Sequence, residues 1–248
     1  MQYLMLILLG VLLGQGMRRI SMLRHLGQVR AARALYGRCC LWVAGMALCA
    51  MAGQLMLLAQ AGMFHVGTAL PLHLCSLMGV LLYPALRSGS RRLWQISLFL
   101  GVPGGLAALV FPAIVSSQTP ALMAFCFFLL HCCLTLGPWL PLALGWRPGP
   151  GGAVCAFGFL LLHGSVAMTV NHLAGTNYLF LAGAPRGTPL AALAAGGQGA
   201  YVAALAGLAA VWIAAEGAAA WLCRRRWPER FPLSLDWRED LGRSRHMG

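Results

Sequence analysis

Seven apolar runs, each close to the length of a membrane-crossing helix, dominate this sequence of 248 residues. They lie at about 2–17, 41–63, 66–86, 93–115, 120–144, 153–174 and 200–222. A bilayer needs roughly 20 apolar residues for each helical span, and a helix satisfies its own backbone hydrogen bonds in lipid. The sequence therefore predicts an all-α, polytopic transmembrane helical bundle of about seven spans over residues 1–222, followed by a basic cytoplasmic tail at 223–248.

The overall composition agrees with a membrane protein, because 60% of the residues are hydrophobic and only 9% are charged. Soluble domains carry about 25% charged residues. The first run is short, but its start has no positive charge and no A-x-A site follows it, so we interpret it as a span rather than a signal peptide.

The distribution of arginine predicts the orientation. All eighteen basic residues are arginine, and seventeen of them fall in 18–38, 87–92, 145–152 and the segment after 222. The opposite loops hold only Arg186. Basic residues favour cytoplasmic loops, so we expect the N-terminus outside and the C-terminus inside a cell membrane. The net charge of +13 would then orient the chain and contact anionic lipid headgroups rather than bind nucleic acid.

Acidic residues are almost absent, and none occurs before Glu216. This excludes paired-carboxylate catalysis, carboxylate proton relays and carboxylate-bound metals from most of the bundle.

The nine cysteines are odd in number and scattered through apolar runs, which argues against a disulfide framework. A metal would need His and Cys ligands, but zinc-type spacings are missing. A haem could join only histidines of different helices, such as His131 and His163. We expect neither a metal nor another cofactor.

The third run, TALPLHLCSLMGVLLYPAL at 68–86, carries a histidine and a cysteine near its middle. We expect one helix here, which places His73 and Cys75 about 200° apart on its surface unless Pro71 breaks its regularity. Titratable groups inside a bilayer are costly and tend to mark function. Counted from the span ends at 1.5 Å per residue, Cys75, His131 and His163 all lie near the membrane midplane.

These residues suggest a nucleophile with a histidine base. A buried thiol stays inert unless an imidazole accepts its proton, so the candidates are Cys75 as nucleophile with His131 or His163 as base. Without carboxylates, an amide would have to orient the base, as in Cys–His–Asn arrangements. Asn171 and Asn177 are the candidates for this amide. Together with two further polar residues they are also predicted to bind substrate: Asn171, His172, Asn177 and Tyr178.

Three stretches of the chain resemble the YwaF-like integral membrane proteins of bacteria. They are LPLHLCSL at 70–77, FFLLH at 127–131 and VNHLAGTNYLFLAGAPRGTPL at 170–190, and the resemblance extends from about residue 40 to 215. This family is related to a vertebrate transmembrane family of ether-phospholipid acyltransferases. The resemblance implies a multi-pass protein of the bacterial plasma membrane that moves fatty acyl groups between phospholipids with a Cys–His pair, and His131 matches the family histidine. The family cysteine would align with Leu72, one turn before Cys75, so the match of the nucleophile is less direct.

The resemblance therefore implies an acyltransferase with a phospholipid donor and a lysophospholipid acceptor. On this basis we predict Cys75 as nucleophile and His131 as base, near the outer half of the bilayer, with His73 or His163 as alternative bases. The alternative is a non-enzymatic membrane protein that binds or transports lipid. Its histidines would then serve as polar packing groups or substrate contacts.

Overall fold

The computed structural model describes residues 2–112, 119–185, 188–226 and 233, and all regular elements within them are helical. In chain order they are α1 (Gln2–His25), α2 (Val29–Gln60), α3 (Val66–Ala69), α4 (Leu74–Arg87), α5 (Arg91–Ile96), η1 (Ser97–Gly101), α6 (Val102–Val110), α7 (Ala121–Leu136), η2 (Gly137–Leu144), α8 (Pro150–Ala174), η3 (Tyr178–Phe180), η4 (Pro189–Gly196) and α9 (Gln198–Arg226).

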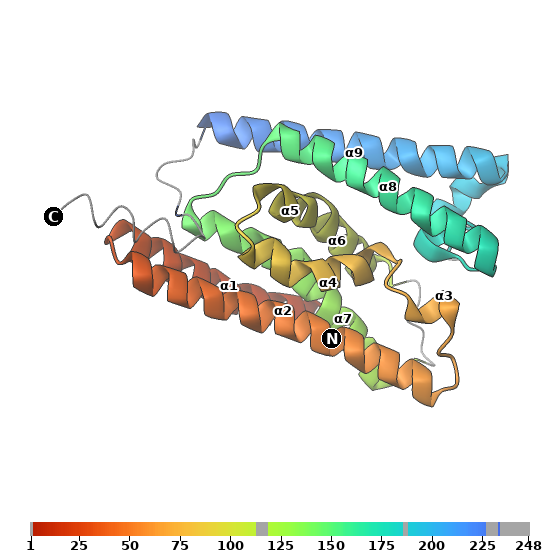
Figure 1. Cartoon of the computed structure of the whole chain (residues 1–248), viewed down its shortest axis with the longest axis horizontal. Helices are drawn as coiled ribbons and strands as arrows, with labels where there is room; N and C mark the ends of the chain where they lie inside the picture. The colour runs from red at the N-terminus through yellow and green to blue at the C-terminus, as the bar shows by residue number, and fades with distance from the viewer. Residues whose placement is uncertain (1, 113–118, 186–187, 227–232, 234–248) are drawn as a thin grey trace.

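Seven helical segments run back and forth between the two ends of the molecule (Figure 1). Six of them are long and apolar enough to cross a membrane, and the seventh, α4, has 14 residues. The prediction of an all-helical bundle with about seven spans is thus confirmed. In Figure 1, α1 and α2 form one side, α4, α5 and α6 lie in the middle, and α8 and α9 form the other side.

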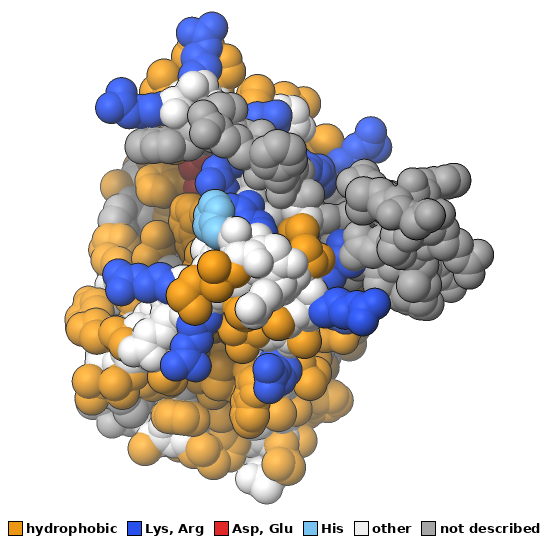
Figure 2. Space-filling view, turned by 90° about the vertical axis from the view of Figure 1, so that its left-hand side faces the viewer, with side chains coloured by type: hydrophobic (Ala, Val, Ile, Leu, Met, Phe, Trp, Pro, Cys, Tyr) orange, Lys and Arg blue, Asp and Glu red, His pale blue; other side chains and the backbone are white. Residues whose placement is uncertain are grey.

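The arginine-rich segment at 18–38 is helical almost throughout, although the sequence suggested a loop between two spans. Helix α1 continues to His25 and α2 begins at Val29. The turn between them is possible because Gly27 adopts a φ of +72°, which costs glycine little. Many arginines gather at this end of the molecule, which Figure 2 shows face-on; we call it the arginine-rich end.

Helix α7 forms the centre of the packing. Ten of its sixteen residues are buried, and it packs against α1, α2, α4 and α6. Pro138 and Pro141 cannot donate α-helical hydrogen bonds, so the chain continues as the 3₁₀ helix η2. There the buried Trp94 of α5 donates its indole N–H to the carbonyl of Pro138 at 2.8 Å.

The third span is not the single helix expected at 68–86. The short α3 ends at Ala69, and α4 starts only at Leu74. Proline disfavours helical backbone in the residue before it, and Leu70, which precedes Pro71, is extended with a ψ of 140°. His73 is also extended, with a ψ of 140°, and it is the N-cap of α4. A non-helical segment therefore lies within the first third of the helix that the sequence predicted.

Two further differences concern the fourth span and the C-terminal region. Residues Ser97–Gly101 form a π-helix, so the span at Arg91–Val110 is not a regular α-helix. Helix α9 extends to Arg226, four residues beyond the predicted end of the bundle at 222. Of the predicted tail after Arg226, only Leu233 belongs to the described residues, and it bonds to the arginine-rich end: its N–H donates to the carbonyl of Leu144 at 3.0 Å.

Candidate functional site

The predicted nucleophile lies at the start of a helix. Cys75 is the second residue of α4. The first backbone hydrogen bond of this helix runs from the N–H of Leu77 to the carbonyl of His73 at 3.0 Å. The N–H groups of the first turn therefore have no partner within the helix. They carry the positive end of the helix dipole, which stabilises negative charge.

The Cys75 thiol packs against the backbone of α6. Its Sγ lies 4.0 Å from the carbonyl oxygen of Gly104 in α6. The side chain is half-buried and packs against the main hydrophobic core. The thiol thus lies between the start of α4 and the backbone of α6.

His131 is buried in α7, with only 4% of its surface exposed. Its Nδ1 donates to the carbonyl of Phe127, one turn earlier, at 2.6 Å. Its ring also packs on the Phe127 ring, with centroids 4.1 Å apart. Because a carbonyl can only accept, the proton of the neutral ring is on Nδ1, and Nε2 keeps a lone pair that can accept a proton.

Consecutive glycines of α6 connect the neighbourhoods of Cys75 and His131. A Cβ on Gly104 would lie 3.9 Å from the Cys75 Sγ, and a Cβ on Gly105 would lie 2.9 Å from the His131 carbonyl oxygen. Cys75 and His131 therefore contact adjacent residues of one helix. Among the described residues, no hydrogen bond joins the Cys75 thiol to an imidazole, so their direct pairing stays a prediction.

The two alternative bases surround the break before α4. His163 of α8 donates from Nε2 to the carbonyl of Leu72 at 3.0 Å. This bond supplies a partner for a backbone group that the break leaves outside any helix, as burial in a membrane requires. His73 instead packs its ring against Tyr178 and Phe180, at centroid distances of 5.0 Å and 5.6 Å.

The predicted substrate-binding amides hold a loop together. The Oδ1 of Asn171, near the end of α8, accepts from the N–H of Tyr178 at 2.7 Å and from the hydroxyl of Thr176 at 2.8 Å. Its Nδ2 donates to the carbonyl of Tyr178 at 2.9 Å. Asn177 binds the next turn, because its Oδ1 accepts from the N–H of Ala182 at 2.9 Å. Both amides are thus engaged with the backbone of the same loop.

This loop, residues 176–183, carries backbone strain next to His73. Leu179 and Phe180 have φ values of +56° and +57°, a region that L-residues with side chains rarely adopt. Tyr178 is buried and donates its hydroxyl to the carbonyl of Val66 in α3. Such strain persists only where the surroundings enforce it. Here it is enforced by the side-chain hydrogen bonds of Asn171 and Asn177 and by the bond of the Tyr178 hydroxyl to Val66. These bonds hold Phe180 against His73.

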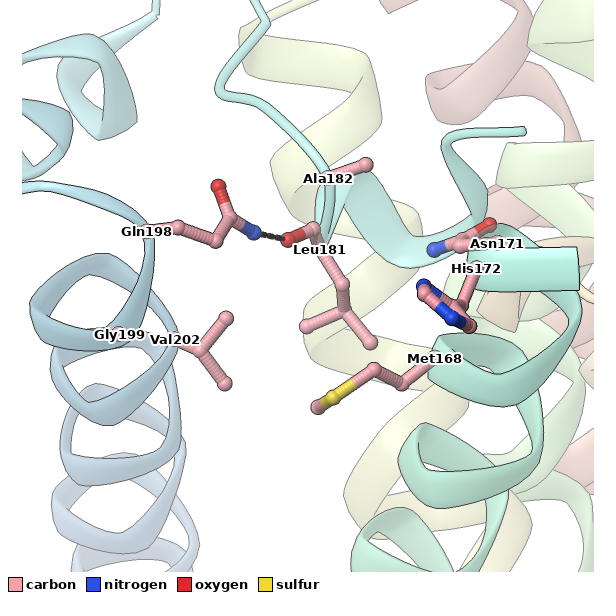
Figure 3. Close-up of a pocket in the computed structure, with 8 residues that line it drawn as sticks. All are labelled: Met168, Asn171, His172, Leu181, Ala182, Gln198, Gly199 and Val202. Carbon is pink, nitrogen blue, oxygen red and sulfur yellow. Dashed lines mark hydrogen bonds between the residues drawn. The ribbon is translucent and has the colours of Figure 1, made fainter. Parts of the chain in front are cut away.

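The remaining predicted residue, His172, faces away from the break. It lines a pocket of about 610 Å³ between the ends of α8 and α9, together with Met168, Leu181, Gln198 and Val202 (Figure 3). The structure thus groups Cys75, His73, His163 and Tyr178 around the start of α4, and it places His172 in a separate pocket.

The sequence model of the TMEM164 family matches residues 1–215. The chain belongs to the TMEM164 family. The match covers six of the seven helical segments and ends within α9, so it includes the candidate site at the start of α4. No curated protein and no solved structure gave a significant match. The family is one of transmembrane proteins, which agrees with the multi-pass architecture.

Several features of this TMEM164-family site escaped the sequence analysis. The glycine pair at 104–105 gives no signal in the sequence, and only the structure shows that Gly104 lies beside the Cys75 thiol and Gly105 beside the His131 carbonyl. Phe180 was missed as a partner of His73, because an aromatic residue in an apolar loop gives no signal by itself. Pro71 was a usable signal for the helix break, since proline restricts the residue before it.

Proposed function

We propose that the chain is a membrane phospholipid acyltransferase in which Cys75 is the acyl-accepting nucleophile. The observation that carries the proposal is the position of Cys75 in the first turn of α4, a helix that starts only at Leu74, inside the third span predicted at 66–86. The N–H groups of the first turn, which have no partner within the helix, are the proposed donors for the acyl-transfer oxyanion. The family membership and the bacterial YwaF-like resemblance support the same chemistry.

His131 is the proposed general base. Its Nδ1 bond to Phe127 fixes the tautomer that leaves Nε2 ready to accept a proton. Proton transfer requires hydrogen-bond reach or one bridging water. The Cys75 thiol and the backbone carbonyl of His131 lie against the neighbouring residues Gly104 and Gly105 of α6, which supports the nearness of α4 and α7. The proposal requires the imidazole to come within reach of the thiol in the reactive complex, and resting enzymes often hold such groups further apart. His73 and His163, which surround the break, are the alternative bases.

The proposed reaction has two steps. In the first, His131 takes the thiol proton, and the Cys75 sulfur attacks the ester carbonyl of a donor phospholipid. A C–S bond forms, the ester C–O bond breaks, and the departing lysolipid oxygen receives the proton from the imidazolium. In the second, the hydroxyl of an acceptor lysophospholipid loses its proton to His131 and attacks the thioester carbonyl. A C–O bond forms, the C–S bond breaks, and the Cys75 thiolate takes the proton back from the imidazolium. Apolar surroundings that hold little water favour this transfer over hydrolysis.

The test uses the purified full-length protein in lipid nanodiscs with a phospholipid that carries an isotope-labelled acyl chain and an unlabelled lysophospholipid. Mass spectrometry follows the labelled chain into the acceptor and measures a thioester adduct on the protein. We expect both signals in the wild type, loss of both in Cys75→Ala, and a strongly reduced transfer rate in His131→Ala. Cys49→Ala, which removes an exposed thiol of α2, is the matched control and should retain full activity.

Transfer that persists in Cys75→Ala would refute the assignment of the nucleophile. If the wild type forms no labelled product and no adduct with any donor headgroup, the non-enzymatic lipid-binding alternative becomes the better account.

A further inference from the structure

The helices α8 and α9 form a pair that is closed at the arginine-rich end and open at the other. At the closed end, a Cβ on Gly217 of α9 would lie 3.0 Å from the Cβ of Ala153 in α8. Gly164 lies eleven residues after Ala153, about three helical turns, and therefore on nearly the same face of α8. A Cβ on Gly164 would meet nothing within 4 Å. The two helices thus separate along their length.

The pocket of about 610 Å³ occupies this opening (Figure 3). Met168 extends from α8 and Val202 from α9, and Leu181 of the connecting loop lies between them (Figure 3). Ligand-binding pockets commonly measure about 300–1,000 Å³. The pocket has room for a ligand of lipid-chain size and is bounded by two membrane-spanning helices.

The polar groups of the pocket carry no formal charge when histidine is neutral. His172 is exposed, and neither of its ring nitrogens has a hydrogen-bond partner among the described residues. Gln198 uses its Nε2 to bind the carbonyl of Leu181, which leaves its Oε1 as an acceptor (Figure 3). Asn171 also borders the pocket, but its amide is engaged with the backbone of Tyr178. A matching ligand needs an apolar chain and an uncharged group that both donates and accepts hydrogen bonds.

The loop at 176–183 separates this pocket from the start of α4. Tyr178 and Phe180 face His73, whereas the next two residues, Leu181 and Ala182, line the pocket. The loop backbone therefore lies between the two sites. A ligand in the pocket contacts the side of the loop opposite to His73.

We propose that the pocket between α8 and α9 is a binding site for a single-chain glycerolipid. The chain lies among Met168, Leu181 and Val202, and the glycerol hydroxyl and ester groups bind His172 and Gln198. A lysophospholipid and a monoacylglycerol share this chemistry. The site needs no acyl transfer, so it does not depend on the proposed enzymatic function.

The experiment is photo-crosslinking of the full-length protein in nanodiscs. Two probes, a lysophosphatidylcholine and a monoacylglycerol, each carry a photoreactive group on the chain, and mass spectrometry maps the labelled peptides. We expect labelling of residues near Met168 and Val202 by at least one probe. Val202→Trp, which fills the pocket, should weaken labelling roughly tenfold, as a loss of 1.4 kcal/mol in binding would. Val211→Trp is the matched control, because Val211 lies on the exposed surface of the same helix, and it should leave labelling unchanged.

Comparison of the two probes identifies the lipid class. Labelling by the lysophosphatidylcholine alone would show that the site requires the phosphate headgroup, and labelling by the monoacylglycerol alone would show that it does not. Labelling should persist in Cys75→Ala; its loss there would show that the probe reports the thiol site and would overturn a separate site. Equal labelling along α8 and α9 that Val202→Trp does not change would show bulk lipid contact and would also overturn the proposal.

Discussion

The side-chain amide of Asn171 binds both backbone groups of Tyr178, accepting from its N–H at 2.7 Å and donating to its carbonyl at 2.9 Å. One buried side chain thereby fixes the conformation of a residue seven positions later. Tyr178 in turn contacts His73 with its ring and Val66 with its hydroxyl. The position of the loop relative to the start of α4 thus depends on Asn171.

We predict that Asn171→Leu destabilises the protein by about 1–3 kcal/mol, because it leaves the buried backbone groups of Tyr178 without partners. Thermal unfolding in detergent, followed by tryptophan fluorescence, measures the effect. Asn177→Leu is the matched control and should cost less, because Asn177 binds backbone groups that are exposed to solvent. Equal losses for the two variants would contradict the importance assigned to the Asn171 bonds.

Leu179 provides a direct measure of the loop strain. Its φ of +56° costs a residue with a side chain about 1–2 kcal/mol relative to glycine. Leu179→Gly should therefore be more stable than Leu179→Ala by about 1 kcal/mol, since both variants remove the same contacts beyond Cβ. The order of the two unfolding midpoints tests this, and a more stable alanine variant would show that the loop is not held in this conformation in solution.

The glycines of α6 offer a comparison between neighbours. Gly105→Ala places its Cβ 2.5 Å from the Thr135 Oγ1 and 2.9 Å from the His131 carbonyl oxygen, so α6 and α7 must move apart. We expect a loss of about 1–3 kcal/mol from this overpacking. Gly104→Ala places its Cβ at 3.7 Å or more from its neighbours and should be tolerated. Expression yield and unfolding midpoint measure both variants; a disruptive Gly104→Ala with a neutral Gly105→Ala would contradict the packing described.

The C-terminal region makes one contact whose loss is measurable. The indole N–H of Trp146, a residue that is only 3% exposed, donates to the carbonyl of Leu233 at 2.9 Å. Deleting residues 229–248 should lower stability by about 1–3 kcal/mol, since it leaves this N–H without its partner. Any acyl transfer should persist, because Leu233 lies far along the chain from the candidate site, at the arginine-rich end. In a Trp146→Phe background the same deletion should cost less, and an equal cost would show that the bond contributes nothing.

The orientation in the membrane is still a prediction from arginine distribution. A reporter fused after Gly248 should be active in the cytoplasm, and a tag inserted at Arg186 should be accessible from outside. A cytoplasmic signal from the Arg186 tag would mean that one of the seven segments does not cross the membrane.

The sequence predicted the helical spans well because hydropathy alone determines which segments can cross a bilayer. It predicted that titratable residues of the third, fifth and sixth spans come together. In the structure His163 of the sixth span bonds to the Leu72 carbonyl of the third, whereas the pairing of His131 in the fifth span with Cys75 stays a prediction. Pro71 indicated a possible break in the third span, but hydropathy alone could not place the start of α4 at Leu74. Nor could it predict the binding of Asn171 to Tyr178, which depends on the path of the loop after α8. Both features arise from local backbone geometry, to which a count of apolar residues is insensitive.

The late start of α4 also determines how this region responds to membrane thickness. Fourteen helical residues rise only about 21 Å, whereas the hydrocarbon layer is about 30 Å thick. Long helices such as α2 accommodate a thicker or thinner bilayer by tilting. The third span meets the same change at Leu70–Leu72, between the helical hydrogen bonds of α3 and those of α4. Lipid chain length would therefore act most directly on the segment that positions Cys75, so the depth of the thiol in the bilayer would vary with the membrane around it.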